Sequence, residues 1–415
     1  AAGPKPSVAF GCARPQPRHR NPGDGARRTG RPQIPFHHQP VRPLGSVQGF
    51  AVLLVGQQDP VWPGARVQFR QSQSDLVAIP SGHQHHTGQL RAMNGLARRG
   101  LHSSQEVNQQ GTGIEMGLTV GLKGDVLTEM GQLTAAGCVG FSQAEVPIPS
   151  TQVLQRALQY ASTFGFTVWL RPQELHLGKG VAASGALATR LGLSGVPVVA
   201  ETIALHTIFE LMKSTGARVH LCRLSSAAGV ALVRQAKLDG LKVTCDISIN
   251  SLHLTDADIG YFDSRARLNP PLRQQRDRDA LRAALADGTI DALCSDHTPV
   301  DEDAKQLPFS EAEPGATGVE LLLPLALKWA TESSLGLSVA IDRITAKPAS
   351  ILGIDAGHLA TGATADVCVF DPEAYWRVEP SALFSLGKNT PFSGFEMRGR
   401  VTHTLVSGNL VYEKK

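Results

Sequence analysis

The stretch "ARVHLCRLSSAAGVALVRQAKLDGLKVTCDISI", residues 217–249, decides the fold of this chain. It opens with an apolar run that predicts a strand, and residues 227–240 then carry apolar side chains at helical spacing. Gly240 stands where that helix should stop, and a second apolar run follows at 241–249. A strand, a helix and another strand in so short a span predict a βαβ unit with parallel strands.

The same alternation continues on both sides of this unit. Further helices are predicted at residues 124–137, 151–165, 276–288 and 318–333, a turn and a long helix at 195–216, and further strands at 139–141, 166–170 and 289–296. Several βα units in a chain of 415 residues predict a TIM-type (β/α)8 barrel, which we place at residues 118–345. Residues 346–415 contain short alternating strands with glycine turns, which predict a small β-sandwich beside the barrel.

The composition favours an ordinary globular protein. Hydrophobic residues make up 42% of the chain and charged residues 18%. Six cysteines are scattered without any CxxC pair, which argues against a zinc knuckle and favours a reducing, cytoplasmic setting. The longest apolar run near the start, residues 50–56, is far too short to cross a bilayer, so no membrane association is expected.

Residues 1–117 differ from the rest of the chain. Residues 1–110 hold 13 Lys and Arg but 4 Asp and Glu, with many prolines and no sustained periodicity, which predicts coil. One interpretation is a basic arm for nucleic acid, but the arginines lack aromatic interleaving and helical spacing. We expect this region to be disordered or frame-shifted, and our hypothesis is that residues 1 to about 115 are not the native sequence because of a frameshift. Peptides matching "HHQPVRPLGSVQ" from the native protein would refute it.

Several motifs in sequence order resemble the dihydroorotase branch of the amidohydrolase superfamily. They are "RVHLCRLSS" (218–226), "LKVTCDISINSLHLTD" (241–256), "LNPPLR" (268–273), "DGTIDALCSDHTP" (287–299), "ITAKPASILGI" (344–354), "GHLATGATADVCVFDP" (357–372) and "NTPFSGFEMRGRV" (389–401). The resemblance implies a barrel enzyme that interconverts carbamoyl aspartate and dihydroorotate. In that family, histidines and carboxylates hold one or two zinc ions at the barrel mouth.

This sequence departs from the family at the positions of the metal ligands. Gln143 stands where the resemblance places a bridging carboxylate, and Arg171 and Arg223 stand where it places histidines. Residues 249–251 replace a Pro-His-His string, and Val300 replaces a further histidine. Arginine stays protonated and has no lone pair for a metal. These positions therefore predict a degenerate site without a metal or other cofactor.

Four residues of the family's pocket remain in this sequence: Asn269, Arg273, Asp296 and His297. Chains with this pattern resemble the non-catalytic, dihydroorotase-like subunits of bacterial aspartate carbamoyltransferase. The resemblance implies a pseudoenzyme in pyrimidine biosynthesis, assembled with the transcarbamoylase catalytic chain in a large hetero-oligomer. The alternative is an active zinc-dependent dihydroorotase or cyclic amidohydrolase.

The other histidines give weaker signals. His83, His85 and His86 lack a preceding apolar strand, so we interpret them as loop residues, and we interpret His206 and His220 as packing residues. One geometric prediction follows for the barrel mouth. We expect Arg223 or Arg171 to direct its guanidinium into the former metal site, with Asp296 as partner.

Overall fold

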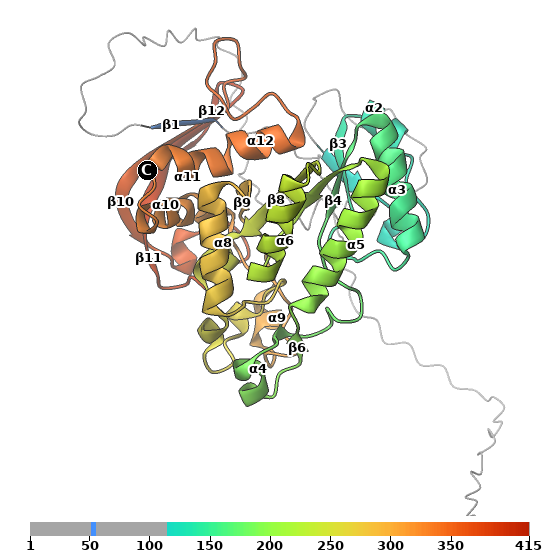
Figure 1. Cartoon of the computed structure of the whole chain (residues 1–415). Helices are drawn as coiled ribbons and strands as arrows, with labels where there is room; N and C mark the ends of the chain where they lie inside the picture. The colour runs from blue at the N-terminus through green and yellow to red at the C-terminus, as the bar shows by residue number, and fades with distance from the viewer. Residues whose placement is uncertain (1–50, 55–113, 415) are drawn as a thin grey trace, which may run out of the picture. The chain divides into compact units, whose positions relative to one another are not determined.

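The computed structural model describes residues 51–54 and 114–414, drawn in colour in Figure 1. Most of the region 1–117, including the three histidines of "HQHH", lies outside the described residues. Neither the basic-arm interpretation nor the frameshift hypothesis is therefore addressed by the structure. The first strand of the main sheet begins at Ile114, before residue 118.

A parallel sheet of six strands forms the centre of the structure. Its strands lie in chain order, each hydrogen-bonded in parallel to the next, as the βαβ pattern predicts. In sheet order they are β2 (Ile114–Gly117), β3 (Cys138–Ser142), β4 (Thr167–Leu170), β7 (Arg218–Leu221), β8 (Val243–Ser248) and β9 (Ala292–Cys294). This sheet and its helices fit the expected TIM-type barrel.

Helices follow the strands and pack side by side against them, as α3, α5, α6 and α8 show in Figure 1. The main helices are α3 (Thr151–Phe164), α5 (Val199–Thr215), α6 (Ala227–Leu238), α8 (Gln275–Asp287), α10 (Leu322–Glu332) and α11 (Leu337–Ile344). Local sequence sets their ends. The Ser150 hydroxyl caps α3 by accepting from the Val153 N–H at 3.3 Å, and Gly165 ends it in the left-handed region.

Shorter elements fill the connections. They are α2 (Met130–Ala135), β5 (Ala182–Ala183), α4 (Ala186–Leu191), β6 (Gly195–Val196), α7 (Ile249–His253), α9 (Glu302–Gln306) and α12 (Ala346–Leu352), with 3-10 turns at Val120–Leu122, Asp256–Ile259, Ser264–Ala266, Val319–Leu321 and Pro380–Ala382. The turn and long helix predicted over 195–216 are observed as the two-residue β6 and α5, with Pro197 between them. No helix among the described residues is both long and apolar enough to cross a membrane.

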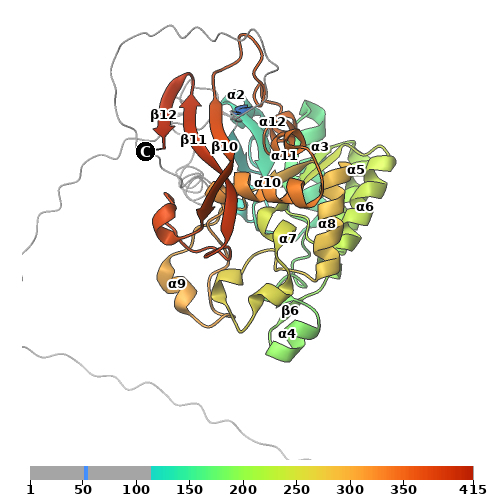
Figure 2. The same ribbon diagram turned by 90° about the vertical axis from the view of Figure 1, so that its left-hand side faces the viewer.

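A second sheet holds the C-terminal residues, with β10, β11 and β12 side by side in Figure 2. β10 (Val367–Arg377) and β11 (Glu396–Val406) are antiparallel, β12 (Asn409–Glu413) continues the sheet, and β1 (Ala51–Leu54) pairs in parallel with β10. The sheet packs on α10 at Gly399, which has φ +94°. A Cβ at Gly399 would lie 2.4 Å from Leu327 Cδ1, so this contact requires glycine.

Candidate functional site

The carboxyl ends of the parallel strands bring most of the singled-out residues together. Gln143 follows β3, Arg171 follows β4, Arg223 lies just beyond β7, and Asp296 lies just beyond β9. Such strand ends form the mouth of a barrel, where active sites of this fold lie. Arg223 and Asp296 have φ of 56° and 47°, a backbone conformation that residues other than glycine rarely adopt. Strain of this kind concentrates at functional sites.

The expected ion pair is present at this mouth. Arg223 Nη1 donates to Asp296 Oδ1 at 2.9 Å, and the Ser248 hydroxyl donates to the other carboxylate oxygen at 2.8 Å. The Arg223 and Asp296 side chains are only 15% and 8% exposed. Asp296 therefore has a charged and a neutral donor, and its carboxylate is held inside the mouth.

A carboxylate that the sequence analysis did not single out joins the two arginines. Glu145 accepts from Arg171 through one oxygen and from Arg223 through the other. Asn269 Nδ2 also donates to Glu145 Oε2 at 2.7 Å, while its Oδ1 accepts from Arg171 Nη2 at 2.5 Å. Arg171 is 6% exposed whereas Glu145 is 45% exposed, so a carboxylate from the solvent side lies on two largely buried guanidinium groups. We call Arg171, Arg223, Asn269 and Glu145 the carboxylate clamp.

The charges of the carboxylate clamp depend on one another. Crowding by protein atoms opposes ionisation of Glu145, but Arg223 and Arg171 outweigh it and hold the pKa of that carboxyl below its ordinary value. Burial lowers the pKa of the Arg171 guanidinium, Glu145 opposes this, and the like charge of Arg223 adds to it. Burial also disfavours the charge of Arg223, yet Glu145 and Asp296 raise its pKa. Both guanidinium groups stay protonated, and each relies on a nearby carboxylate.

Gln143 does not take part in the carboxylate clamp. Its side-chain oxygen accepts from the Thr119 hydroxyl at 2.9 Å, and its amide nitrogen donates to the Leu122 carbonyl at 3.0 Å. The residue is 2% exposed. It therefore anchors the loop between β3 and α3, the loop that carries Glu145.

The other two expected pocket residues lie elsewhere. His297 Nδ1 accepts from the Gly318 N–H at 3.1 Å, so this buried imidazole fixes the backbone ahead of α10. Arg273 Nε donates to the Ser225 hydroxyl at 2.8 Å, and that hydroxyl in turn donates to buried Glu201. Through these hydrogen bonds both residues support the fold in this structure.

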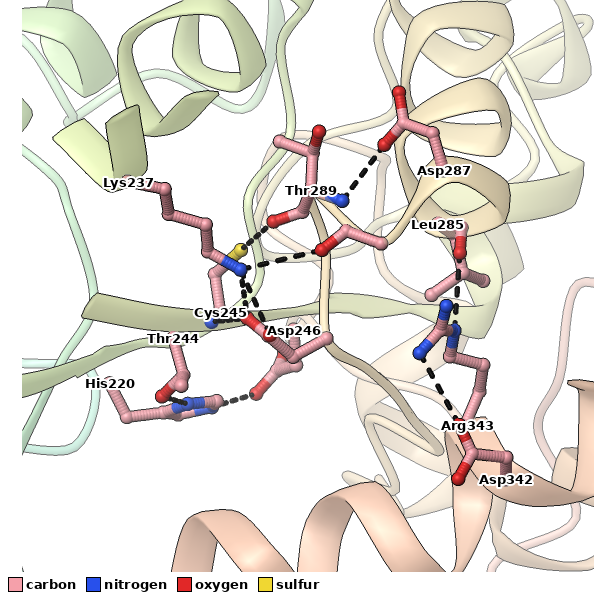
Figure 3. A network of polar contacts seen from close by, with 12 residues as sticks. His220, Lys237, Thr244, Cys245, Asp246, Leu285, Asp287, Thr289, Asp342 and Arg343 are labelled. Atoms are coloured by element: carbon pink, nitrogen blue, oxygen red, sulfur yellow. Dashed lines mark hydrogen bonds and ion pairs between the residues drawn. The ribbon is translucent and has the colours of Figure 1, made fainter. Parts of the chain in front are cut away.

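A second polar cluster lies deeper in the sheet. His220 on β7 contacts the Thr244 hydroxyl through Nδ1 at 2.8 Å and Asp246 Oδ2 through Nε2 at 2.9 Å (Figure 3). The other oxygen of Asp246 accepts from the Arg223 N–H at 2.9 Å. One ligand atom each from His220, Asp246 and Cys222 lies within 4.8 Å of the others. This part of the site corrects the interpretation of His220 as a packing residue alone.

These two clusters differ in how they suit a zinc ion. The strand-end residues do not suit one, because guanidinium groups have no lone pair and would repel a cation. The deeper cluster offers an imidazole, a thiol and a carboxylate, which are the donor types that zinc takes in proteins. Among the described residues, the chemistry of a zinc site is thus met by His220, Cys222 and Asp246 and not by the positions that the resemblance implied.

Comparison with known proteins agrees with this architecture. The family model described as "Amidohydrolase family" matches residues 195–411, which is more than half of the chain. The chain belongs to the amidohydrolase family. The L-hydantoinase (dihydropyrimidinase) from Arthrobacter aurescens is similar in fold, with a TM-score of 0.66, 24% sequence identity, and coverage of 78% of this chain and 74% of that one.

Curated relatives are closer in sequence than these structures. The dihydroorotase of Geobacter sp. (strain M21) is 43% identical over 297 residues, which are 71% of this chain and 70% of the relative. The dihydroorotase of Citrifermentans bemidjiense is 41% identical over the same shares. These relatives confirm the resemblance to dihydroorotases.

They also correct one prediction. We expected a pseudoenzyme, and many relatives about 40% identical over some 70% of the chain are dihydroorotases, which indicates an enzyme. The prediction rested on matching single positions to metal ligands. It did not consider the donor set of His220, Cys222 and Asp246 one layer below.

Proposed function

We propose that the protein is a cyclic amidohydrolase of the dihydroorotase type. Its substrates would be dihydroorotate and carbamoyl aspartate, the two sides of one ring-opening equilibrium in pyrimidine biosynthesis. The observation that carries the proposal is the 43% identity to a dihydroorotase over 70% of that relative's length. The barrel and the polar strand ends support it, because the mouth of such a barrel is where its enzymes bind substrate.

In the ring-opening direction, water adds to the ring carbonyl, the carbon–nitrogen bond breaks, and the released nitrogen takes a proton. Both compounds carry carboxylates, so the protein must hold negative charge at the mouth. Arg171, Arg223 and Asn269 provide donors for this at the strand ends. A zinc ion held by His220, Cys222 and Asp246 would supply Lewis acidity and a more acidic bound water.

The test is a direct assay of the full chain. Purified protein, with and without added zinc, is given dihydroorotate or carbamoyl aspartate, and the dihydroorotate concentration is followed by ultraviolet absorbance. We expect interconversion in both directions, and we expect Asp246→Asn to reduce it strongly. A folded protein that shows no turnover in either direction would contradict the proposal.

We further propose that the protein associates with the aspartate carbamoyltransferase catalytic chain. The support is the similarity of its motifs to the dihydroorotase-like subunits of that complex, and association is compatible with catalysis by this chain. The two chains would be co-expressed with a tag on one of them, and the complex would be sized by light scattering. Recovery of the tagged chain alone at micromolar concentration would argue against the association.

A further inference from the structure

Glu145 occupies the position of a ligand rather than that of a structural residue. Its carboxylate receives donors from Arg171, Arg223 and Asn269, which come from three different loops. The acid itself stands on the loop after β3 and is 45% exposed, whereas the two arginine side chains are almost buried. The fixed part of the carboxylate clamp is therefore its donor set, and the carboxylate is its most accessible member.

We infer that these donors form a binding subsite for the carboxylate of a small-molecule ligand, and that Glu145 is an internal carboxylate that the ligand displaces. The forked donors of two guanidinium groups match the two oxygens of a carboxylate, and the Asn269 amide adds a third direction. The inference deepens the proposed function, from which it takes its ligand class, carboxylates related to carbamoyl aspartate.

Charge explains why the position needs an anion. Asp296 is the only other carboxylate that contacts the guanidinium groups of Arg171 and Arg223 within the described residues, and it pairs with Arg223 alone. Without Glu145, the Arg171 guanidinium would keep the neutral Asn269 Oδ1 as an acceptor but would contact no carboxylate among the described residues. A largely buried guanidinium without a carboxylate is unfavourable, so a ligand carboxylate would take the place of Glu145.

The surroundings leave room for this exchange. A cavity of about 210 Å³ borders Arg171 and is lined by Val146–Pro149, the residues that directly follow Glu145. The loop is anchored on its other side by Gln143, whose amide is fully engaged with Thr119 and Leu122. Movement of Glu145 therefore does not require Gln143 to release its contacts, and the body of a ligand can lie beside Arg171.

The inference is tested by calorimetric titration of the full chain with succinate and with N-carbamoyl-L-aspartate. Glu145→Gln removes the competing charge and should tighten binding of both probes by about fivefold or more. Arg171→Lys keeps the charge but loses the fork, and should weaken binding by about tenfold. Glu210→Gln is the matched control, because Glu210 is an exposed acid paired with Lys213 on α5, and it should change nothing.

Two results would overturn the inference. One is unchanged affinity in Glu145→Gln, and the other is an equal gain for chloride, which would show attraction to any anion rather than a carboxylate subsite. Arg171→Lys is checked by its unfolding curve, and Asn269→Ala provides a second weakened variant if it fails to fold. Succinate has no carbamoyl group and cannot be turned over, so its binding is measured apart from activity. Tighter succinate binding by Glu145→Gln, in a protein that lacks dihydroorotase activity, would therefore support the subsite and contradict the proposed function. Dihydroorotase activity with unchanged succinate binding in Glu145→Gln would support the proposed function and contradict the subsite.

Discussion

Replacing Asp296 by asparagine tests whether the Arg223–Asp296 pair supports the barrel mouth. Asparagine tolerates the positive φ of this position and can still accept the Ser248 hydroxyl, so the change removes charge and little else. The pair is 2.9 Å long, and both side chains are at most 15% exposed. Breaking such a buried pair costs about 3–5 kcal/mol. Because Glu145 still contacts Arg223, we expect the lower end of that range.

The effect of Asp296→Asn is compared with substitutions of two more exposed acids, Glu145 and Glu210. Glu145→Gln should cost less than Asp296→Asn, since Glu145 is 45% exposed and solvent screens its ion pairs, although Arg171 then contacts no carboxylate among the described residues. The double variant should lose more than the sum of the two single changes, because Arg223 then has no carboxylate partner. Glu210→Gln, which removes an exposed ion pair with Lys213, is the control and should cost less than about 1 kcal/mol.

The assay is urea unfolding at pH 7, followed by circular dichroism and by tryptophan fluorescence so that any intermediate is detected. The urea midpoints of the unchanged protein and of its four variants are compared at equal slope. If Asp296→Asn loses no more stability than Glu210→Gln, the pair does not support the mouth and the reasoning fails. Strict additivity of Asp296→Asn with Glu145→Gln would show that Arg223 does not link the two acids.

Three further outcomes are expected. Burial, and then the charge of Arg282, lowers the pKa of His253 to about 3. Below pH 6.5 the unfolded chain therefore binds a proton that the folded chain does not, and the protein becomes less stable as the pH is lowered. At pH 5 this loss is about 2 kcal/mol, and His253→Gln should abolish that part of the difference between the urea midpoints at pH 7 and pH 5. Arg171→His combined with Arg223→His should raise zinc affinity at least about tenfold in equilibrium dialysis, and an unchanged affinity would show that these side chains do not face a common ligand position. Gly399→Ala should lower the free energy of unfolding by about 1–3 kcal/mol in urea unfolding, which is more than Gly240→Ala should. Both glycines have positive φ, but only at Gly399 would the added carbon lie 2.4 Å from Leu327.

The barrel could be predicted because its signals are local. Apolar spacing, a serine cap and a C-terminal glycine define α3 within the sequence itself, and the predicted helix at 151–165 differs from the observed one by a single residue. Boundaries were less accurate where strands are short. The predicted strand at 289–296 is observed only at Ala292–Cys294, because ladder pairing with β8 covers just those residues. The proposal that residues 1–117 are not native still depends on peptide analysis.

The site could be predicted only in part, since contacts between distant segments are not visible in a sequence. The pair of Arg223 and Asp296 was expected because opposite charges follow two parallel strands, β7 and β9, whose carboxyl ends lie at the same edge of the sheet. Glu145 was missed, although it lies two residues after Gln143, because nothing local shows that the loop turns its carboxylate back onto Arg171. His297 and Arg273 were expected in the pocket because they belong to pocket motifs; in the structure His297 accepts from the Gly318 N–H and Arg273 donates to the Ser225 hydroxyl.

In the proposed function, binding and turnover therefore rest on different residues. A divalent metal at a barrel mouth both attracts anions and activates water. Two guanidinium groups at the same strand ends keep the attraction, because they carry the same total charge and add directional donors, but they cannot bind water as a Lewis acid. The proposals thus give carboxylate binding to Arg171, Arg223 and Asn269, and within the described residues they give zinc chemistry to the His220, Cys222 and Asp246 cluster below them. Variants of Arg171, Arg223 and Asn269 should change carboxylate affinity more than turnover. Variants of His220, Cys222 and Asp246 should change turnover more than affinity.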